Sequence, residues 1–383
     1  MRRFCTLFLF TIALLLSTQA TLFAGNVTVV VGPATCQPRY AHFSTIQSAV
    51  SSVPTGSKVM VCPGTYPGQV VITEPLTLQG VTDGTGDAAV ISVPGGGLLV
   101  NATTPLFGPV TAQLLVENTP EVTVSNIIVD GTGSTCVAGA NRAIGLLFLN
   151  VGTSVDGTSA GKIEDVVVRN QHNGCGEGIL SDTSFITITS NEVHDIDLTP
   201  IQCNAGQNNI VSNNVQNGGN GIVVNNATTK TTVSNNTVSN VTSTLGYEGI
   251  GLWVNGGEAT FSKNTVSLGN LGQGAIGAYL NFSGAGTTIT GNTINDLYYG
   301  VYLSESTGAS VQSNAISNTS ADGIVDTFSF GGNILTKNTV NEAAFGIFTD
   351  STVGGDTLTP NNFYNVVVTI DPGPLGTPGT PVN

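Results

Sequence analysis

The chain is poor in charge. Only 9% of its 383 residues are Asp, Glu, Lys or Arg, and 24 acidic residues against 10 basic ones give a formal net charge of −14. A surface that binds nucleic acid or anionic lipid needs clustered Lys and Arg side chains. The few basic residues are scattered along this chain, so the sequence predicts no nucleic-acid partner and no binding to an anionic membrane.

Long apolar runs are also missing after the first residues. Arg2 and Arg3 precede a short apolar run at residues 8–16 and small residues that end at Ala20. This order is typical of an export signal peptide, because the run is too short to cross a bilayer. We predict a signal peptide at residues 1–20, or alternatively 1–24. The protein is then secreted, periplasmic or on the cell surface, with no membrane span.

A phrase centred on Asn recurs along the chain, as in TGNTIND around Asn292. From Asn191 onward the spacings are 22, 23, 28, 28, 22 and 24 residues, and such periods are typical of solenoids. We expect each Asn to lie at a left-handed bend and to exchange amide hydrogen bonds from coil to coil, with Asp165 in the same slot. The predicted Asn ladder consists of Asn126, Asn191, Asn213, Asn236, Asn264, Asn292, Asn314 and Asn338.

A glycine followed by a short alternating strand forms a second landmark. Two more short strands lie between landmarks, and three strands per turn, each with one inward face, wind into a β-helix. The predicted fold is all-β, a single-stranded right-handed parallel β-helix of about eleven coils. We call the sheet that follows the glycines the Gly-led sheet and expect positive φ at each glycine. The landmarks are Gly145, Gly178, Gly221, Gly249, Gly277, Gly300, Gly323 and Gly346, with Pro200 in one coil.

The region before the repeat predicts a cap. Residues 44–53 have the pattern of a short amphipathic helix with Ser44 as N-cap. Solenoids need caps over their open cores, so we expect this helix to close the N-terminal end. Its predicted apolar face consists of Ile46, Ala49, Val50 and Val53.

The expected organisation has three parts after the signal peptide. Residues 25–80 form the cap and first coils, and residues 81–355 form the β-helix body. Residues 356–383 comprise a C-terminal strand and a flexible tail rich in Pro and Gly.

The N-terminal region also carries motifs that resemble a known family. TIQ-x-AV is followed by V-x-V-x-PG-x-Y and then by V-x-I-x-x-PLTLQG, which ends at Gly80. This order is similar to that of secreted right-handed parallel β-helix proteins of the pectin-lyase-like superfamily, including pectin methylesterases. The resemblance implies the fold over residues 40–350 and places the substrate cleft of active relatives on the outward face of the Gly-led sheet.

The catalytic motifs of that family are absent. The chain contains neither the Asn-Thr-Asp, Asp-Asp, Gly-His-Gly and Arg-Ile-Lys signatures of polygalacturonases nor the Asp-Phe and Gly-Arg-Pro-Trp stretches of methylesterases. The resemblance therefore implies fold and not catalysis.

The cysteines suit an exported protein. Cys36 and Cys62 flank the predicted cap helix, and we predict a disulfide that links it to the first coil. Cys136 and Cys175 lie at equal distances after their predicted ladder positions, so they should stack on neighbouring coils within disulfide reach. Cys203 falls at an inward strand position and is expected to be a buried free thiol.

Strand alternation predicts which residues of the Gly-led sheet face outward. Three rings fall in one outward column, and the single Trp lies beside it. We call these four rings the aromatic platform, because spaced rings stack well against sugar faces and nearby amides bind hydroxyl groups. The alternative is a patch covered by loops at residues 239–248 and 269–274. The predicted glycan-binding residues are Trp253, Tyr279, Tyr302 and Phe348 of the platform, with Asn225 and Asn281.

No Lys or Arg falls in these outward columns. A polysaccharide lyase needs a base and a cation that neutralises the uronate carboxylate. The lyases of the family supply that cation with Arg, Lys or Ca²⁺. The face therefore favours recognition over lyase chemistry.

A second group of candidates combines histidines and carboxylates from adjacent coils beside Arg169. Such groups can form an acid/base pair or a metal site, although the spacing matches no metal motif and side chains at bends are usually solvated. The turns at residues 83–87 and at Asp130 resemble Ca²⁺ turns only loosely, so we predict no cofactor, with Ca²⁺ as the alternative. The candidate catalytic residues are His172, Glu177, Asp182, His194, Asp195 and Asp197.

Three hypotheses for the function follow. The leading one is a protein that binds a polysaccharide or cell-surface glycan along the outward face of the Gly-led sheet, with no catalysis established. The second is a carbohydrate-active enzyme, a lyase or glycoside hydrolase of pectin-like substrates. The third is a structural or adhesive rod whose rigid shape is itself the function.

Overall fold

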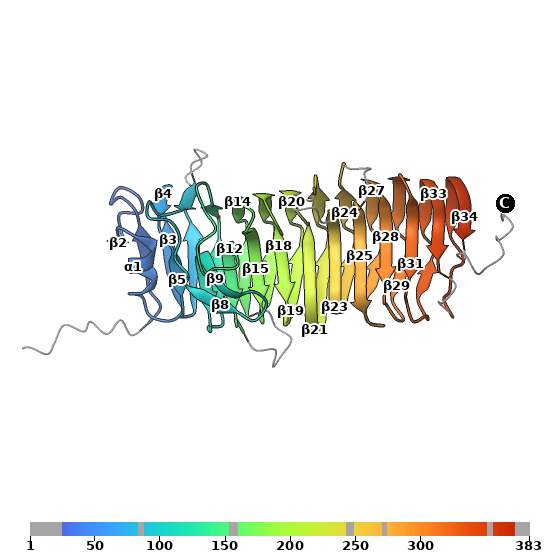
Figure 1. The fold of residues 1–383 in the computed structure, drawn as a ribbon. Coiled ribbons are helices and arrows are strands. Elements are labelled where there is room, and N and C mark those ends of the chain that lie inside the picture. Colours follow the sequence, from blue (N-terminus) through green and yellow to red (C-terminus); the bar gives the residue numbers. More distant parts are fainter. Residues whose placement is uncertain are drawn as a thin grey trace, which may run out of the picture.

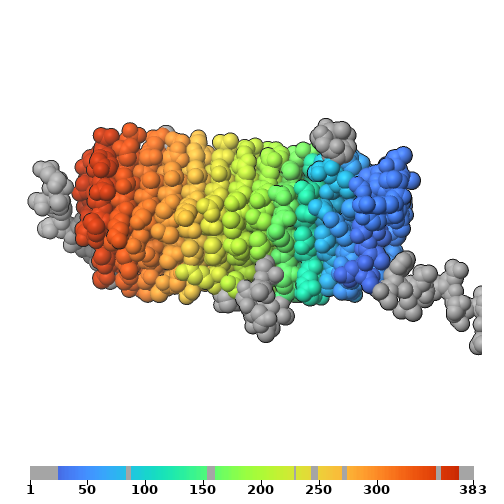
Figure 2. All heavy atoms as spheres, turned by 180° about the vertical axis from the view of Figure 1, so that it is seen from behind, coloured from blue at the N-terminus to red at the C-terminus, as the bar shows by residue number. Residues whose placement is uncertain are grey.

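The computed structural model describes residues 25–82, 88–152, 160–242, 249–269, 274–350 and 355–371. The predicted signal peptide, the turn at residues 83–87 and the tail after Asp371 lie outside these ranges, as does most of each predicted covering loop. The described chain winds into a right-handed parallel β-helix, which confirms the predicted fold. Figure 1 shows a straight rod, and Figure 2 shows the coils as successive bands along a cylinder.

Three stacks of parallel strands run the length of the rod. The Gly-led sheet contains β5 (Val70–Ile72), β9 (Gly108–Glu117), β12 (Ala143–Leu149), β15 (Gly176–Asp182), β18 (Ile201–Asn204), β21 (Ile222–Ser234), β23 (Ile250–Ser262), β25 (Ile276–Ser283), β28 (Tyr299–Ser304), β31 (Asp322–Thr327) and β33 (Thr339–Thr349).

The second sheet contains the ends of β21 and β23 together with β1 (Thr28–Val31), β3 (Ser57–Val61), β6 (Leu76–Gly80), β10 (Val122–Ser125), β13 (Gly161–Glu164), β16 (Phe185–Thr189), β19 (Gln207–Val211), β26 (Thr288–Thr290), β29 (Ser310–Gln312) and β32 (Ile334–Thr336).

The third sheet contains the start of β33 together with β4 (Gly64–Pro67), β7 (Ala89–Ser92), β11 (Ile127–Asp130), β14 (Val167–Gln171), β17 (Glu192–Ile196), β20 (Asn214–Gly218), β22 (Thr237–Ser239), β24 (Thr265–Ser267), β27 (Thr293–Leu297), β30 (Ala315–Thr319) and β34 (Asn362–Asp371). Two strands lie outside the stacks. They are β2 (Ala41–Phe43), which pairs with β1, and β8 (Ala102–Thr104), which pairs antiparallel with β9.

The core is a continuous apolar filling along the rod axis. Inward residues of successive strands, such as Val254, Leu280 and Leu303, are fully buried and belong to one hydrophobic cluster. Alternation along each strand sends one side chain into this core and the next one outward. The register of the strands therefore decides which side chains the surface presents.

Helix α1 (Ile46–Val50) covers the N-terminal end of the core, where Figure 1 shows it beside β3 and β5. Its residues Ile46, Ala49 and Val50 are buried against the core, as predicted, and Val53, which follows the helix, is partly buried there. The helix is shorter than predicted, and its N-cap is Thr45 rather than Ser44. The Thr45 hydroxyl accepts a hydrogen bond from the backbone N–H of Ser48, which satisfies one of the free donors of the first turn. No helix among the described residues has the length and apolar character needed to cross a bilayer.

The predicted Asn ladder exists from Asn191 to Asn338 and continues to Asn361. At Asn264, for example, the side-chain oxygen accepts from the backbone and side-chain nitrogens of Asn236, both at 3.0 Å. The amide nitrogen of Asn264 donates to the Val233 carbonyl at 3.0 Å and to Asn292 Oδ1 at 2.9 Å. Because the side chains from Asn191 to Asn338 are buried, the ladder satisfies polar groups that water cannot reach.

Two details of the predicted ladder were wrong. The left-handed bend belongs to the residue before each ladder Asn, for example Ser190 before Asn191. Asn126 and Asp165 occupy that bend, with φ of 53° and 52°, and are not members of the ladder. In their coils the ladder slot holds the buried apolar residues Ile127 and Val166.

The landmark glycines are required by close approach and not by positive φ. A Cβ added at Gly300 would lie 2.3 Å from the carbonyl oxygen of Gly323 in the next coil, and Gly277 is similarly close to Gly300. Only a residue without a side chain allows the strands to stack at that distance. In one coil this position belongs to Gly251 rather than Gly249, because Leu252 pairs with Ala278.

The two predicted disulfides are confirmed. Cys36 pairs with Cys62, and Cys136 pairs with Cys175 on the neighbouring coil. Cys203 is a buried free thiol, and burial raises its pKa far above the ordinary value, so it does not supply a thiolate.

Candidate functional site

The register of the Gly-led sheet aligns its outward side chains into three columns. The central column contains the whole aromatic platform, because Trp253 pairs with Tyr279 and Tyr279 with Tyr302. Val325 follows Tyr302, and Phe348 follows Val325. Trp253 therefore stands in the same column as the tyrosines rather than beside it, and Val325 separates Phe348 from the other rings.

The rings of neighbouring coils contact one another. The ring centroids of Trp253 and Tyr279 are 5.9 Å apart, and the two rings are stacked. The ring centroids of Tyr279 and Tyr302 are 5.5 Å apart, and these rings meet edge to face. All three rings are partly exposed, so each has one surface against its neighbours and another toward solvent. Pairs of this kind hold the rings in fixed orientations.

The strand alternation that starts at the landmark glycines did not predict that Tyr299 belongs to this surface. Tyr299 precedes Gly300 and stands in the outward column next to the platform, 5.4 Å from Tyr302 between ring centroids. Burial, followed by its neighbours Tyr298, Asp322 and Tyr302, raises the pKa of Tyr299 to about 12, so this phenol keeps its proton. The signal in the sequence was Tyr298-Tyr299 before the landmark glycine, since the residue before that glycine also faces outward.

A polar column borders the rings on the other side. Asn255, Asn281, Ser304 and Thr327 follow one another in register. The Asn281 amide donates to Asn255 Oδ1 at 3.2 Å, and the Thr327 hydroxyl donates to Tyr302 Oη at 3.0 Å. Amide and hydroxyl groups thus lie two residues along the strand from the rings. Asn225 belongs to the same column but is nearly buried, which makes it the least accessible of the six predicted glycan-binding residues.

Toward the N-terminus the same columns are covered. Leu115, Leu147 and Leu180 face outward but are fully buried in a second hydrophobic cluster outside the core. The hairpin of β8 and β9 supplies the cover, with Leu106 and Phe107 packed against that cluster. In Figure 1 β8 lies across the N-terminal strands of the Gly-led sheet. We call residues 102–110 the lid.

Two of the candidate carboxylates have structural partners near the lid. Asp182 is fully buried, and its carboxylate accepts from the backbone N–H of Leu106 at 3.1 Å and from the Asn204 amide at 2.8 Å. Glu177 lies 3.0 Å from Arg142 Nε, and burial raises its pKa to about 7 against the opposing effect of Arg142. Both groups hold elements together and are closed to a polymer.

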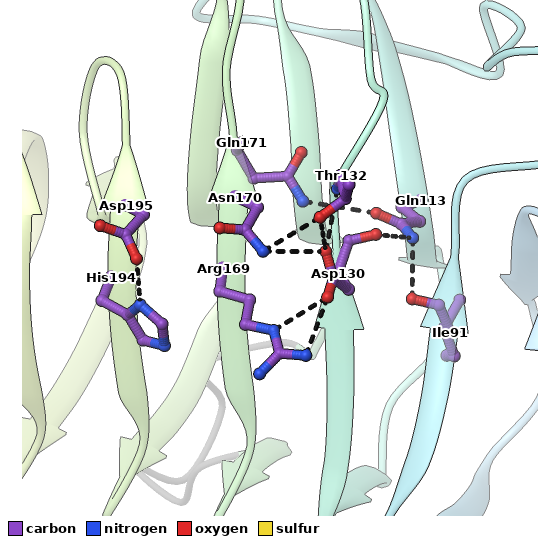
Figure 3. Close-up of polar contacts among 9 residues, drawn as sticks. All are labelled: Ile91, Gln113, Asp130, Thr132, Arg169, Asn170, Gln171, His194 and Asp195. Carbon is purple, nitrogen blue, oxygen red and sulfur yellow. Dashed lines mark hydrogen bonds and ion pairs between the residues drawn. The ribbon is translucent and has the colours of Figure 1, made fainter. Parts of the chain in front are cut away.

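The histidine candidates form two separate pairs. Nδ1 of His172 lies 3.1 Å from Asp197 Oδ1, and Nδ1 of His194 lies 2.6 Å from Asp195 Oδ2. The His194 hydrogen bond lowers the pKa of Asp195 below its ordinary value. Figure 3 shows the His194–Asp195 pair apart from the network to its right. The predicted cluster therefore consists of two His–carboxylate pairs, of which His172–Asp197 joins adjacent coils.

That network is centred on Asp130. Arg169 Nε and Nη2 both lie 2.9 Å from Asp130 Oδ2, and Asn170 and Thr132 donate to Oδ1 (Figure 3). Partial burial alone would raise the pKa of Asp130, but the hydrogen bonds from Thr132, Asn170 and Arg169 outweigh it and lower the pKa to about 2. Asp130 is a permanently charged anchor of the bend.

In the described ranges no group of three or more His, Cys, Asp or Glu side chains converges as metal ligands would. At the Asp130 turn the carboxylate is paired with Arg169. The turn at residues 83–87 lies outside the described residues.

Comparison with known proteins defines the fold. A family model described as "Right handed beta helix region" matches residues 220–369. Among curated proteins no match is found. The right-handed β-helix fold that the N-terminal motifs imply is thereby confirmed.

Solved structures share this fold at low identity. The GH136 lacto-N-biosidase from Eubacterium ramulus is 14% identical, with a TM-score of 0.56 over 89% of this chain and 68% of that one. The A-module of the mannuronan C-5 epimerase AlgE4 from Azotobacter vinelandii is 15% identical, with a TM-score of 0.55 over 88% of this chain and 94% of that one. The complex of XylC with xylose is 10% identical, with a TM-score of 0.55 over 88% and 86%. These likenesses show the fold alone.

Proposed function

We propose that the protein binds a glycan along the outward face of the Gly-led sheet, from Trp253 to Phe348. The observation that carries the proposal is the alignment of Trp253, Tyr279 and Tyr302 on consecutive strands, with partly exposed side chains and centroid separations of 5.9 and 5.5 Å. Rings held in a row at the spacing of the coils offer successive stacking positions to an extended polymer.

The surroundings of the rings support a sugar as the ligand. The column of Asn255, Asn281, Ser304 and Thr327 supplies donors and acceptors beside the ring faces, which suits hydroxyl groups at the edge of a sugar ring. Structures with this fold include a lacto-N-biosidase, a mannuronan C-5 epimerase and a complex of XylC with xylose. The partner proposed is a polysaccharide or cell-surface glycan.

Binding without catalysis fits the candidate groups. Glu177 and Asp182 are buried against Arg142 and the lid, and the histidines are engaged with neighbouring carboxylates at bends. A general acid or base must reach the bond that it cleaves, and these groups do not face the platform.

Export completes the proposal. Two disulfides link residues of the N-terminal coils, and such bonds persist in oxidising compartments. We place the protein outside the cytoplasm, as the pattern of residues 1–20 predicts.

Affinity electrophoresis with neutral and acidic polysaccharides tests the platform. Tyr279→Ala combined with Tyr302→Ala should weaken retention at least about tenfold, because two stacking rings are removed. Tyr364→Ala is the matched control, since this ring is 57% exposed at the far end of the rod. Equal retention of the double variant and the control would refute the proposal. New reducing ends or unsaturated products from wild-type protein would establish the enzymatic alternative.

A further inference from the structure

Phenylalanines stand exposed at the bend after the Gly-led sheet. Phe282 is 55% exposed and Phe328 is 68% exposed. Both adopt left-handed backbone conformations, with φ of 49° and 55°. The bulk of a phenylalanine makes this conformation unfavourable. These rings therefore have strained backbones and gain little from burial.

Folding does not require phenylalanine at this bend. Equivalent bends of earlier coils hold Asn118, Asn150, Thr183, Ala205 and Asn226, and of these residue types Asn tolerates the left-handed conformation best. Exposed apolar groups in strained conformations are typical of binding sites, since neither feature stabilises the free protein.

The two rings border the surface proposed above for glycan binding. Phe282 follows Asn281 of the polar column, and Phe328 follows Thr327, whose hydroxyl bonds to Tyr302. The N–H of Phe328 donates to Asp350 Oδ2 at 2.8 Å, which fixes the bend. Glu305 occupies the bend of the coil between them, so the rings are two coils, or about 10 Å, apart along the rod. They form an outer row parallel to the platform.

The charges of this region favour a neutral ligand. The three outward columns from Ile250 to Asp350 contain Asp322 and Asp350 but no Lys or Arg, and Glu305 adds a carboxylate at the bend. A uronate polymer would bring its own carboxylates against these groups without a cation to offset them. The hydroxyl groups of a neutral sugar instead donate hydrogen bonds to carboxylates and amides.

We propose that the ligand is a neutral glycan chain that lies on the aromatic platform, with Phe282 and Phe328 along one edge of the chain. This inference rests on the proposed function and adds to it both the ligand class and a second row of binding residues. The strand spacing orients the chain along the rod axis, because both rows of rings repeat in that direction.

Isothermal titration with soluble xylan and galactan, against polygalacturonate and alginate at low ionic strength, tests the ligand class. We expect wild-type protein to bind a neutral polymer more tightly than either polyuronate. Tighter binding of a polyuronate would overturn the neutral class while leaving the platform intact. Wild-type protein that binds none of the four polymers would overturn both proposals.

Phe282→Asn combined with Phe328→Asn tests the second row. This pair restores the residue of equivalent bends, so we expect the melting temperature to stay unchanged or rise. Affinity for the neutral polymer should fall about tenfold. Tyr364→Ala again serves as the control for loss of an exposed ring.

The outcomes of the two variant pairs are separable. If Tyr279→Ala with Tyr302→Ala weakens binding while the Asn pair binds like wild type, the second row is wrong and the platform stands. If both pairs bind like wild type, both proposals fail. A protein ligand at the exposed rings would appear as loss of partner binding in the Asn pair with unchanged affinity for every glycan, and would also overturn the inference.

Discussion

The two halves of the rod use the same backbone repeat with different side chains. In the N-terminal half, residues 25–182, the ladder slot after the bend between the second and third sheets holds apolar residues such as Ile127 and Val166, and two disulfides join neighbouring segments. In the C-terminal half, residues 191–361, the same slot holds the Asn ladder. The outward face of the Gly-led sheet differs as well, because the lid buries leucines in one half while rings reach solvent in the other. The same backbone repeat therefore accepts different stabilising groups inside the coil and different side chains on its outward face.

The largest effect is expected from breaking the ladder. Asn264→Leu removes the side-chain oxygen that accepts from both nitrogens of Asn236 and the amide that donates to the Val233 carbonyl, in a buried site, while Asn292 Oδ1 keeps the backbone N–H of residue 264 as a donor. We expect a loss of about 4 to 6 kcal/mol in the free energy of unfolding. Urea unfolding measures it, with Asn209→Ala on the exposed face of β19 as the control. A loss no greater than that of the control would show that the ladder is dispensable.

The disulfide that closes the lid-side coils should have the next largest effect. Cys136→Ser combined with Cys175→Ser opens a covalent loop of 39 residues. The expected loss is about 3 to 4 kcal/mol, because the unfolded chain gains conformational freedom. Thermal melting with and without reductant checks this, since reduced wild-type protein should move toward the variant. If oxidised wild type, reduced wild type and the variant all melt at the same temperature, the disulfide does not stabilise the N-terminal half.

A pH-dependent effect is expected near the C-terminal end of the rod. Asp326 points into the core, and burial, with Asp356 nearby, raises its pKa to about 7 despite hydrogen bonds from Ser329 and Asn333. The folded protein therefore holds a proton that the unfolded chain releases near pH 4. This contribution to stability is present below about pH 4 and is lost as the pH rises toward 7.

The variant Asp326→Asn lacks this titrating carboxyl group, so comparing its stability with that of wild type isolates the contribution of Asp326. The variant should be more stable than wild type by about 2 kcal/mol at pH 8, and the difference should shrink at pH 5. Glu177, whose pKa burial also raises to about 7, titrates in both proteins and cancels in the comparison. Melting temperatures of both proteins at pH 5 and pH 8 test this prediction. A difference in stability between them that does not change with pH would show that Asp326 is not the titrating group.

The smallest effect is expected from the lid. Phe107 packs on the outward leucines, and the Arg142 guanidinium lies 4.6 Å from its ring centre. Phe107→Ala should lower the free energy of unfolding by about 1 to 2 kcal/mol and leave glycan affinity unchanged, because the platform lies beyond the lid. Melting and titration of the same sample test both parts. A change in affinity would show that the N-terminal half takes part in binding.

Register explains where prediction from the sequence succeeded. The spacing of the Asn phrases predicted the β-helix and the ladder, and equal offsets predicted the Cys136–Cys175 disulfide. An offset of one residue placed Asn126 and Asp165 in the ladder by mistake, since Asn and Asp are also favoured at the left-handed bend. One residue is enough to turn a side chain from the core to the bend.

Packing explains where prediction failed. Asp182 lies at an outward strand position, and only the lid, which is distant in sequence, shows that it is buried. Tyr299, Phe282 and Phe328 were missed because their orientation depends on bends that alternation does not describe. Adjacent coils likewise brought each candidate carboxylate a partner that the spacing did not reveal.

The sequence by itself determined the repeat, and with it the three-sheet rod, because strand alternation and turn chemistry are local and recur in every coil. Only the tertiary structure decided which outward residues reach solvent, since that depends on loops and coils that meet across many residues. The rings from Trp253 to Phe348 became a candidate site through the exact pairing of neighbouring strands, which local patterns constrain but do not complete.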